Sequence, residues 1–258
     1  EWSYSRQGLA YFSASVTIWE DVFHYQFYLV TDERVYYYNQ KGISGDVLDE
    51  VYDFKILTDY QQPAWVKEGV FYQIFPDRFC NGNQYNDVES GEYNFDGYPS
   101  VRVKEWDRIP SGYWDSHCLD FYGGDLDGVI RKIPYLKKLG IDGVYLNPVF
   151  SAATVHKYDC LDYFHVDPHL GGDRALARLC HALHLNDMKV ILDISINHTG
   201  TEHRWFNKDG SFFSLEEGAY HNPKAKEREY YFFREDGSYQ CWNGVETLPV
   251  LNYTSRQL

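Results

Sequence analysis

The sequence predicts an α/β fold in which parallel strands alternate with helices, preceded by a small all-β region. From about residue 70 onward, apolar runs of strand length alternate with segments whose apolar residues recur at helical spacing. Before residue 60, aromatic and β-branched residues alternate with other residues in the manner of half-buried strands. Helical segments between hydrophobic strands are typical of βαβ crossovers, and therefore of a parallel sheet.

Residues 1–62 are predicted to form the β region. Asp59–Pro63 is typical of a linker, because Pro63 cannot continue a central strand and the pattern changes after it. The expected strands are Ala14–Trp19, Phe23–Val30 and Arg34–Tyr38.

Residues 63–198 are predicted to form three strand-and-helix units. Pro134 lies inside the first helix and is expected to kink or divide it, because proline lacks an amide hydrogen. The expected order is strand Gly69–Phe75, helix Leu126–Leu139, strand Ile141–Asn147, helix Asp173–Leu185 with a buried stripe of Leu176, Leu179, Cys180 and Leu183, and strand Met188–Asn197.

The third strand is the most informative, because its two faces differ. Alternation places Asp193, Ser195 and Asn197 on one face, so polar residues accumulate toward the carboxyl end, where parallel α/β folds carry their sites. On spacing alone, Asp193 as a residue that caps a loop at the strand end is an equally good interpretation. The opposite face is expected to be buried under helices and consists of Val190, Leu192, Ile194 and Ile196.

Residues 199–258 are predicted to form an inserted subdomain at the end of the third strand. After Thr199 no helical pattern follows, and about 55 residues are rich in Gly, Asn, Tyr and charge. Within them, Tyr230–Phe233 is a candidate short strand.

Composition excludes several functions. The 24 Lys and Arg against 38 Asp and Glu give a net charge of −14, and no basic run occurs, so nucleic acid is not an expected partner. No apolar run is long enough to span a membrane, so no membrane partner is expected. The five cysteines lie far apart in an odd number, which favours reduced thiols in the cytoplasm over a disulfide framework. Aromatic residues make up 18% of the chain, which favours a surface that binds rings, although most such side chains pack in cores.

Five short motifs together resemble the α-amylase family of glycoside hydrolases, family 13. Asp193–His198 matches the DxxxNH signature that the family carries on its third barrel strand. The other four resemble the neopullulanase, cyclomaltodextrinase and maltogenic amylase group of that family. They are Phe71–Phe79, Gly123–Leu126, His156–Asp159 and Leu248–Asn252.

The resemblance implies a fold class, α/β, in which residues 63–198 supply the first three βα units of a (β/α)8 TIM barrel. Residues 199–258 then correspond to the inserted subdomain B after strand 3. Residues 1–62 resemble the latter half of the group's N-terminal starch-binding β-sandwich, so the chain is expected to be an internal fragment. The group dimerises through this domain, which is compatible with a homodimer of the full-length enzyme.

A structural calcium ion is expected near the first helix. Calcium takes six to eight oxygen ligands in flexible geometry, and the resembling group binds it through a loop with this spacing. The alternative is an ordinary Asn/Gly turn with Asp125 serving only as the N-cap of the helix. Asn83 stands where relatives often carry Asp, which removes one charge. The expected ligands are Asn81, Asn83, Asn86, Asp87, the Gly123 carbonyl and Asp125.

Four residues are the expected contacts for an α-glucan oligosaccharide. By resemblance, Tyr158 stacks on the sugar ring at the cleavage subsite, and His198 donates a hydrogen bond to one of its hydroxyls. Asp193 supports the site through hydrogen bonds and is not the nucleophile. His156 is expected nearby. Without the surrounding motif, Tyr158 would be interpreted as one more core aromatic residue.

No catalytic residue is assigned within the chain. Retaining glycosidases use two carboxylates about 5 Å apart, and in the family these follow the fourth and fifth strands, beyond residue 258. The first hypothesis is therefore a piece of a hydrolase of α-1,4 and some α-1,6 glucosidic bonds, inactive by itself. The alternative is a non-catalytic chain that binds α-glucan or calcium, which an exposed incomplete sheet disfavours.

Overall fold

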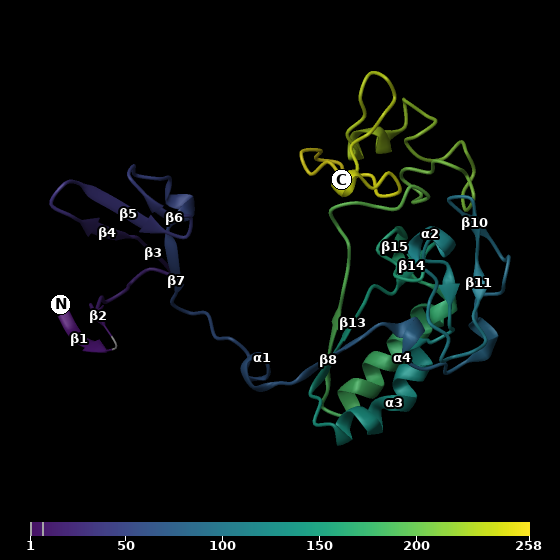
Figure 1. The fold of residues 1–258 in the computed structure, drawn as a ribbon, viewed down its shortest axis with the longest axis horizontal. Helices are drawn as coiled ribbons and strands as arrows, with labels where there is room; N and C mark the ends of the chain where they lie inside the picture. Colours follow the sequence, from purple (N-terminus) through teal and green to yellow (C-terminus); the bar gives the residue numbers. More distant parts are fainter. Residues whose placement is uncertain (1, 7) are drawn as a thin grey trace. The chain divides into compact units, whose positions relative to one another are not determined.

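The structure is a computed structural model, and it describes residues 2–6 and 8–258. The chain divides into two compact units, one ending at Lys67 and the other comprising Glu68–Leu258 (Figure 1). A short helix, α1 (Ala64–Glu68), lies at the division, and Asp59–Pro63 before it contains no helix or strand.

The first unit consists of small antiparallel sheets. Strand β1 pairs with β2, β3 pairs with β7, and β4, β5 and β6 form a meander. The ring of Phe54 on β7 lies 5.4 Å from the ring of Tyr25 and 5.4 Å from that of Tyr38, so aromatic contacts join two of these sheets. The elements are β1 (Trp2–Arg6), β2 (Leu9–Phe12), β3 (Val22–Tyr25), β4 (Phe27–Val30), β5 (Val35–Asn39), β6 (Gly42–Ser44), the 3-10 turn η1 (Glu50–Tyr52) and β7 (Phe54–Leu57).

Two strand predictions for this unit need correction. Ala14–Trp19 lies outside any strand and is largely exposed, because β propensity does not form a strand without a pairing partner. Phe23–Val30 is interrupted at Gln26, so its two halves belong to different sheets. The segment predicted as Arg34–Tyr38 forms β5, shifted by one residue.

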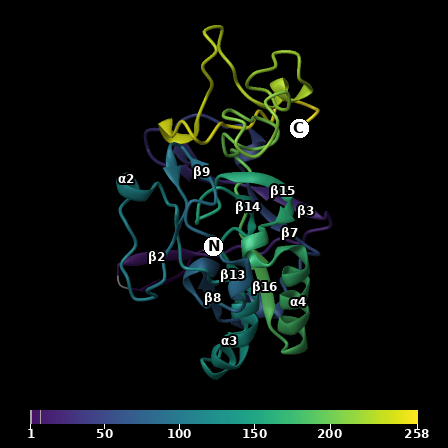
Figure 2. The ribbon, with the colours of Figure 1, turned by 90° about the vertical axis from the view of Figure 1, so that its right-hand side faces the viewer.

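The second unit is built around three parallel strands, β8 (Phe71–Ile74), β13 (Gly143–Leu146) and β16 (Lys189–Leu192). Their order in the sheet is β16-β13-β8, with Leu146 paired to both Ile74 and Leu192. Consecutive strands are therefore neighbours (Figure 2), and each crossover contains a helix, as the sequence predicts.

Two helices, α3 (Leu126–Lys138) and α4 (Gly172–Leu185), pack side by side and enclose the main core with the sheet. Pro134 does not divide α3, because the apolar residues around it remain buried and hold the helix in place although one hydrogen bond is lost. The residues buried from the two helices are Leu126, Val129, Ile133, Leu136, Ala175, Leu179 and Leu183, with Leu176 and Cys180 only half-buried.

The third strand is shorter than predicted. β16 ends at Leu192, and residues 193–197 continue without strand pairing. Ile194 and Ile196 are 41% and 55% exposed, so the prediction that helices bury them is wrong for this chain. Among the described residues β16 pairs only with β13, so it lies at the edge of a three-stranded sheet and strand pairing holds it on one side only.

The remaining elements of the second unit connect the strands. A hairpin of β14 and β15 follows the second strand, and the loop between them carries residues 153–159. These elements are η2 (Pro76–Arg78), η3 (Gln84–Asn86), β9 (Asn94–Phe95), β10 (Tyr98–Pro99), β11 (Val101–Arg102), α2 (Tyr113–Ser116), β12 (Asp120–Phe121), β14 (Phe150–Ala152), β15 (Cys160–Val166) and η4 (Pro168–Leu170).

Residues 199–258 contain two short 3-10 turns, η5 (Lys226–Tyr230) and η6 (Trp242–Gly244), and otherwise irregular chain. Tyr230–Phe233 does not form the candidate strand, because only isolated bridges occur there. The segment has a core of its own around Phe206, which is fully buried. Its end returns to its start, since the Leu251 amide donates to the Asn197 carbonyl (3.0 Å).

Candidate functional site

Tyr158 and Asp193 meet at the carboxyl ends of the parallel strands. The Tyr158 hydroxyl donates to Asp193 Oδ2 at 2.6 Å. Tyr158 comes from the loop between β14 and β15, and Asp193 directly follows β16. Burial, with Asp193 as its hydrogen-bond acceptor, raises the pKa of Tyr158 to about 12, so the hydroxyl stays protonated and remains a donor. The hydrogen bond from Tyr158 therefore fixes the orientation of the Asp193 carboxylate.

His198 is buried and holds the backbone of Tyr158. Its Nε2 lies 3.1 Å from the Tyr158 carbonyl oxygen, and its Nδ1 lies 2.6 Å from Asn197 Nδ2. Because a carbonyl only accepts, Nε2 carries the proton and Nδ1 accepts from the amide, which is the pattern of a neutral ring. Burial lowers the pKa of His198, in agreement with this form.

His156 completes the set of four predicted residues. Its Nδ1 accepts a hydrogen bond from the Tyr158 amide at 3.1 Å, and the two rings lie 5.8 Å apart. Burial lowers the pKa of His156 although Asp159 lies nearby. The structure therefore brings Tyr158, His198, Asp193 and His156 into one connected cluster.

Three side chains besides the four expected contacts also belong to this cluster, and of these the sequence placed only Ser195 on the face that carries the site. Asn147 Nδ2 lies 3.5 Å from the Tyr158 hydroxyl, and its Oδ1 accepts from Gln73 Nε2 at 2.9 Å. Ser195 Oγ donates to the Tyr158 carbonyl at 2.8 Å. Asn147 could have been found, because it is a polar residue directly after an apolar strand that neighbours the strand before Asp193. Gln73 has a weaker signal, since it lies within its strand.

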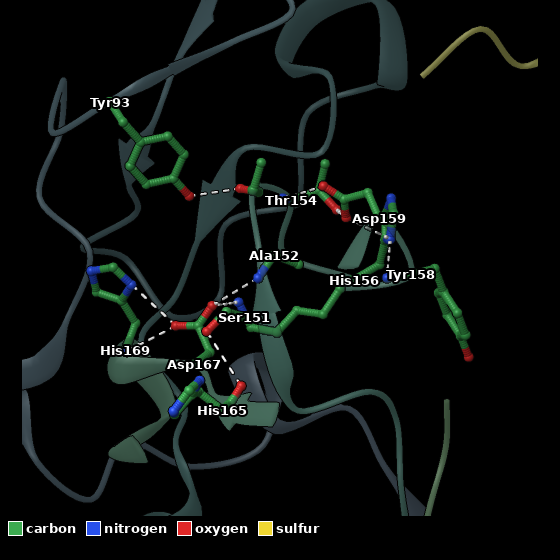
Figure 3. A network of polar contacts seen from close by, with 12 residues as sticks. Tyr93, Ser151, Ala152, Thr154, His156, Tyr158, Asp159, His165, Asp167 and His169 are labelled. Atoms are coloured by element: carbon green, nitrogen blue, oxygen red, sulfur yellow. Dashed lines mark hydrogen bonds and ion pairs between the residues drawn. The ribbon is translucent and has the colours of Figure 1, made fainter. Parts of the chain in front are cut away.

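A buried ion pair fixes the loop that carries His156 and Tyr158. Lys157 Nζ lies 2.6 Å from Asp167 Oδ2, and each side chain is 4% exposed. Figure 3 shows Asp167 with its contacts to His169. Lys157 adopts φ of 59°, an uncommon conformation for a residue with a side chain, which persists only where the surroundings hold it. His169 also contacts Asp167, at 3.2 Å. Burial alone would raise the pKa of Asp167, but Lys157 and His169 hold it well below its usual range.

Gly200 packs so closely against the end of this loop that it has no room for a side chain. A Cβ on Gly200 would lie 2.6 Å from the Asp159 carbonyl oxygen. The side chain of Asp159 is buried and accepts from the Thr154 amide at 3.0 Å. The start of the 199–258 segment is thus packed directly on the loop that carries Tyr158.

The six residues expected to bind calcium lie around the start of α3, and Asp125 is the N-cap of this helix. Its Oδ1 accepts from the Gly128 amide (2.6 Å) and the Gly82 amide (3.0 Å). Its Oδ2 accepts from the Asn83 amide at 2.7 Å. Burial raises the pKa of Asp125. Asp125 therefore caps the helix, and the cap also ties the Asn-rich loop to the helix.

Asp87 has a cationic neighbour that the sequence did not reveal. The Arg102 guanidinium forms a short ion pair with Asp87 Oδ2, and Asn81 Nδ2 donates to Asp87 Oδ1 at 2.7 Å. A Cβ on Gly123 would lie 2.4 Å from Asp87 Oδ1 and 2.7 Å from the guanidinium. Gly123 therefore has to be glycine for the carboxylate and guanidinium to approach its backbone.

The oxygen-rich set fits calcium in its chemistry. In the part of the chain that the structure describes, no group of three or more His, Cys, Asp and Glu side chains is arranged to hold a metal ion. A calcium ion here would therefore depend on amide and carbonyl oxygens besides the two carboxylates, which calcium accepts readily. When the side-chain amide of Asn86 is oriented to suit its neighbours, its oxygen accepts a hydrogen bond from the backbone amide of Gly171 at 3.2 Å. Arg102 would compete with the ion for Asp87.

The family is decided by a match to the alpha amylase catalytic domain over residues 73–254, well over half of the chain. The chain belongs to the alpha-amylase family. This membership agrees with the predicted α/β fold class, because the catalytic domain of the family is a (β/α)8 barrel.

Curated relatives of this alpha-amylase family chain carry related names. The amylopullulanase of Thermoanaerobacterium saccharolyticum is 33% identical over 254 residues, covering 88% of this chain and 19% of the relative. The maltogenic alpha-amylase of Bacillus acidopullulyticus is 43% identical over 141 residues, covering 55% of this chain and 21% of the relative. The chain thus spans about a fifth of the length of these two relatives. The predicted group, which includes maltogenic amylase and cyclomaltodextrinase, is confirmed.

Solved structures agree with this assignment. The type III pullulan hydrolase of Thermococcus kodakarensis superposes with a TM-score of 0.66 at 26% identity, covering 90% of this chain and 40% of that one. The cyclic α-maltosyl-(1→6)-maltose hydrolase of Arthrobacter globiformis in complex with maltose superposes with a TM-score of 0.61 at 27% identity, covering 76% and 40%. Among the described residues of our chain, no helix has the length and apolarity to cross a membrane.

Proposed function

We propose that the protein containing this chain is a retaining glycoside hydrolase of α-1,4 and some α-1,6 glucosidic bonds in maltooligosaccharides, cyclodextrins or pullulan. The observation that carries the proposal is the hydrogen-bonded cluster of Tyr158, Asp193 and His198 at the carboxyl ends of parallel strands, in a chain of the alpha-amylase family. Parallel α/β folds place their active sites at this end. Relatives named cyclomaltodextrinase and pullulan hydrolase support the substrate class.

In this proposal the cluster binds one glucosyl unit. The half-buried ring of Tyr158 stacks on the apolar face of the sugar, since flat aromatic rings and pyranose faces are complementary. Asp193 accepts the Tyr158 hydroxyl hydrogen bond and so keeps the ring in place, which favours a supporting role over that of nucleophile. His198 is neutral and buried, so it would have to exchange its bond to the Tyr158 carbonyl in order to donate to a sugar hydroxyl.

The bond-breaking carboxylates belong to later strands in this proposal. A retaining mechanism needs a nucleophile and an acid/base carboxyl about 5 Å apart. In the resembling family these are an Asp after the fourth strand and a Glu after the fifth, so they would lie beyond residue 258. Residues 63–198 then form the first three βα units of the barrel, residues 199–258 its inserted subdomain B, and residues 1–62 part of a β-sandwich through which the full-length enzyme dimerises.

Calcium is part of the proposal as a structural ion. It would be held by oxygens of Asn81, Asn83, Asn86, Asp87 and Asp125 and by the Gly123 carbonyl. When bound, it would cross-link the Asn-rich loop to the start of α3. The close approach of Asp87 to Gly123, and of Asp125 to the loop backbone, supports this placement.

The proposed location is the cytoplasm, with α-glucan as partner and neither nucleic acid nor membrane. All five cysteines are unpaired. The Bacillus subtilis relative that is 41% identical over 142 residues is named intracellular maltogenic amylase.

The test compares the full-length protein with residues 1–258 alone. We expect the full-length protein to release reducing sugar from maltooligosaccharides, and proton NMR to show the α-anomer as the first product. We expect the isolated chain to release none. Measurable turnover by homogeneous 1–258 would overturn the assignment of the carboxylates to later strands. Binding of maltoheptaose by the full-length protein without any hydrolysis would instead favour a non-catalytic α-glucan-binding protein.

A further inference from the structure

Three aromatic rings are stacked next to the Tyr158 cluster. The His117 ring lies 3.8 Å from the Tyr98 ring on one side and 4.7 Å from the Tyr113 ring on the other, with interplanar angles of 16° and 20°. Tyr98 belongs to β10, and His117 ends α2. Tyr113, the outermost ring, is 47% exposed. The stack therefore ends in an accessible aromatic ring.

The stack is held in place by its surroundings. His117 Nδ1 lies 3.0 Å from Asp96 Oδ2. Asp96, His117 and Cys118 have φ of 50°, 46° and 62°, in the left-handed region that side chains disfavour. Such conformations persist only where packing determines them, and they gather at binding sites. The tight turn positions His117 between the two tyrosines.

Two residues of the stack and part of the loop that carries Tyr158 line one pocket. Tyr113 and His117 line it from one side, and His156, Asp159 and Thr154 line it from the side of the Tyr158 loop. Leu248 and its neighbours close it from the 199–258 segment. Since the His156 ring also lies 5.8 Å from the Tyr158 ring, the pocket adjoins the proposed cleavage subsite.

We propose that the Tyr98–His117–Tyr113 stack is a further subsite, which binds a glucosyl unit of the α-glucan next to or beyond the unit held at Tyr158. This inference rests on the proposed function. The sugar would be the next layer of the stack, on the accessible ring of Tyr113, and its hydroxyls would donate to Asp96, whose side chain is 45% exposed. The subsite would increase affinity for longer chains without taking part in bond cleavage.

The chemistry of the pocket favours a neutral, hydroxyl-rich ligand. Its lining residues include two carboxylates, Asp96 and Asp159, and no Lys or Arg occurs among those that the structure describes. An anionic ligand such as a phosphate ester would be repelled there. Trp114, 80% exposed and edge-on to Tyr113 at 5.1 Å, adds a second ring at the rim.

The test measures the dependence of hydrolysis on chain length in the full-length protein. For Tyr113→Ala we expect the KM for maltoheptaose to rise about two- to tenfold, as the loss of one aromatic stacking contact predicts, with kcat unchanged. The kinetics with p-nitrophenyl α-glucoside, which has a single glucosyl unit, should remain those of the wild type. Tyr113→Phe keeps the ring and should retain the wild-type KM for maltoheptaose.

A matched control is available on α3. Tyr135 is 49% exposed, so Tyr135→Ala removes a tyrosine of nearly equal exposure at a different place. It should leave KM and kcat for both substrates unchanged. Equal KM values for wild type and Tyr113→Ala with maltoheptaose, or an equal change for both substrates, would overturn the subsite. If the wild type hydrolysed neither maltoheptaose nor p-nitrophenyl α-glucoside, the proposed function itself would be overturned.

Discussion

Replacing Lys157 with Met should strongly destabilise the protein, because it leaves the carboxylate of Asp167 buried without its main counter-charge. The two groups are 2.6 Å apart and each side chain is 4% exposed. Breaking a buried pair from one side costs about 3–5 kcal/mol. Asp167 keeps hydrogen bonds from the His169 amide (2.8 Å) and ring (3.2 Å), so the expected loss lies at the lower end, about 3 kcal/mol.

The assay is urea unfolding of the full-length protein, followed by tryptophan fluorescence, with a matched surface pair as control. Lys226 Nζ lies 3.7 Å from Glu227 Oε1, and the Lys226 side chain is 72% exposed. Lys226→Met should therefore lower the free energy of unfolding by no more than about 1 kcal/mol. If Lys157→Met and Lys226→Met had equal effects, the buried pair would not be what holds the Tyr158 loop.

Three further predictions concern the site, the calcium position and pH. Tyr158→Phe keeps the ring but removes the 2.6 Å hydrogen bond to Asp193, so kcat should fall about 10- to 100-fold with little change in KM; an unchanged kcat would contradict the role of this bond. Arg102→Ala removes the guanidinium that competes for Asp87, so calorimetry should show tighter calcium binding than in the wild type, and Asp87→Ala should abolish binding; equal affinities in all three would remove the proposed site. Burial alone would lower the pKa of His169, but Asp167 and Glu92 raise it above its ordinary value, so its stabilisation is complete below about pH 6.5 and is lost as pH rises through the raised pKa. The wild type should therefore have the higher urea midpoint at pH 6, and its difference from the midpoint of His169→Gln should become smaller toward pH 9. A difference that stays constant with pH would contradict this linkage.

The sequence predicted the parts of the fold that depend on long periodic patterns. Both core helices and the three strands of the β16-β13-β8 sheet were predicted, because a buried stripe at helical spacing and an apolar run are strong local signals. The strand predicted at Ala14–Trp19 is wrong, because a strand needs a pairing partner and the local sequence does not specify that partner. The end of β16 at Leu192 depends on its position at a sheet edge, which the alternation of Ile194 and Ile196 does not reveal.

The candidate site was predictable where residues fall within motifs and not where they approach from elsewhere. Tyr158 and Asp193 are 35 positions apart, yet both fall within motifs that the sequence analysis singled out, and the structure joins them by a hydrogen bond. Arg102 was missed because nothing in its own neighbourhood indicates contact with Asp87, 15 positions away. Tyr113 was missed for the same reason, since its stacking on His117 requires the left-handed turn that follows α2.

The most direct test of the proposed function is the structure of the full-length protein with a bound, non-hydrolysable maltooligosaccharide. We expect one pyranose ring stacked on Tyr158, with the Tyr158 hydroxyl still bonded to Asp193 and two carboxylates from residues beyond 258 on either side of the scissile position. A sugar bound away from Tyr158, or a scissile bond flanked by carboxylates from within residues 1–258, would contradict the proposal.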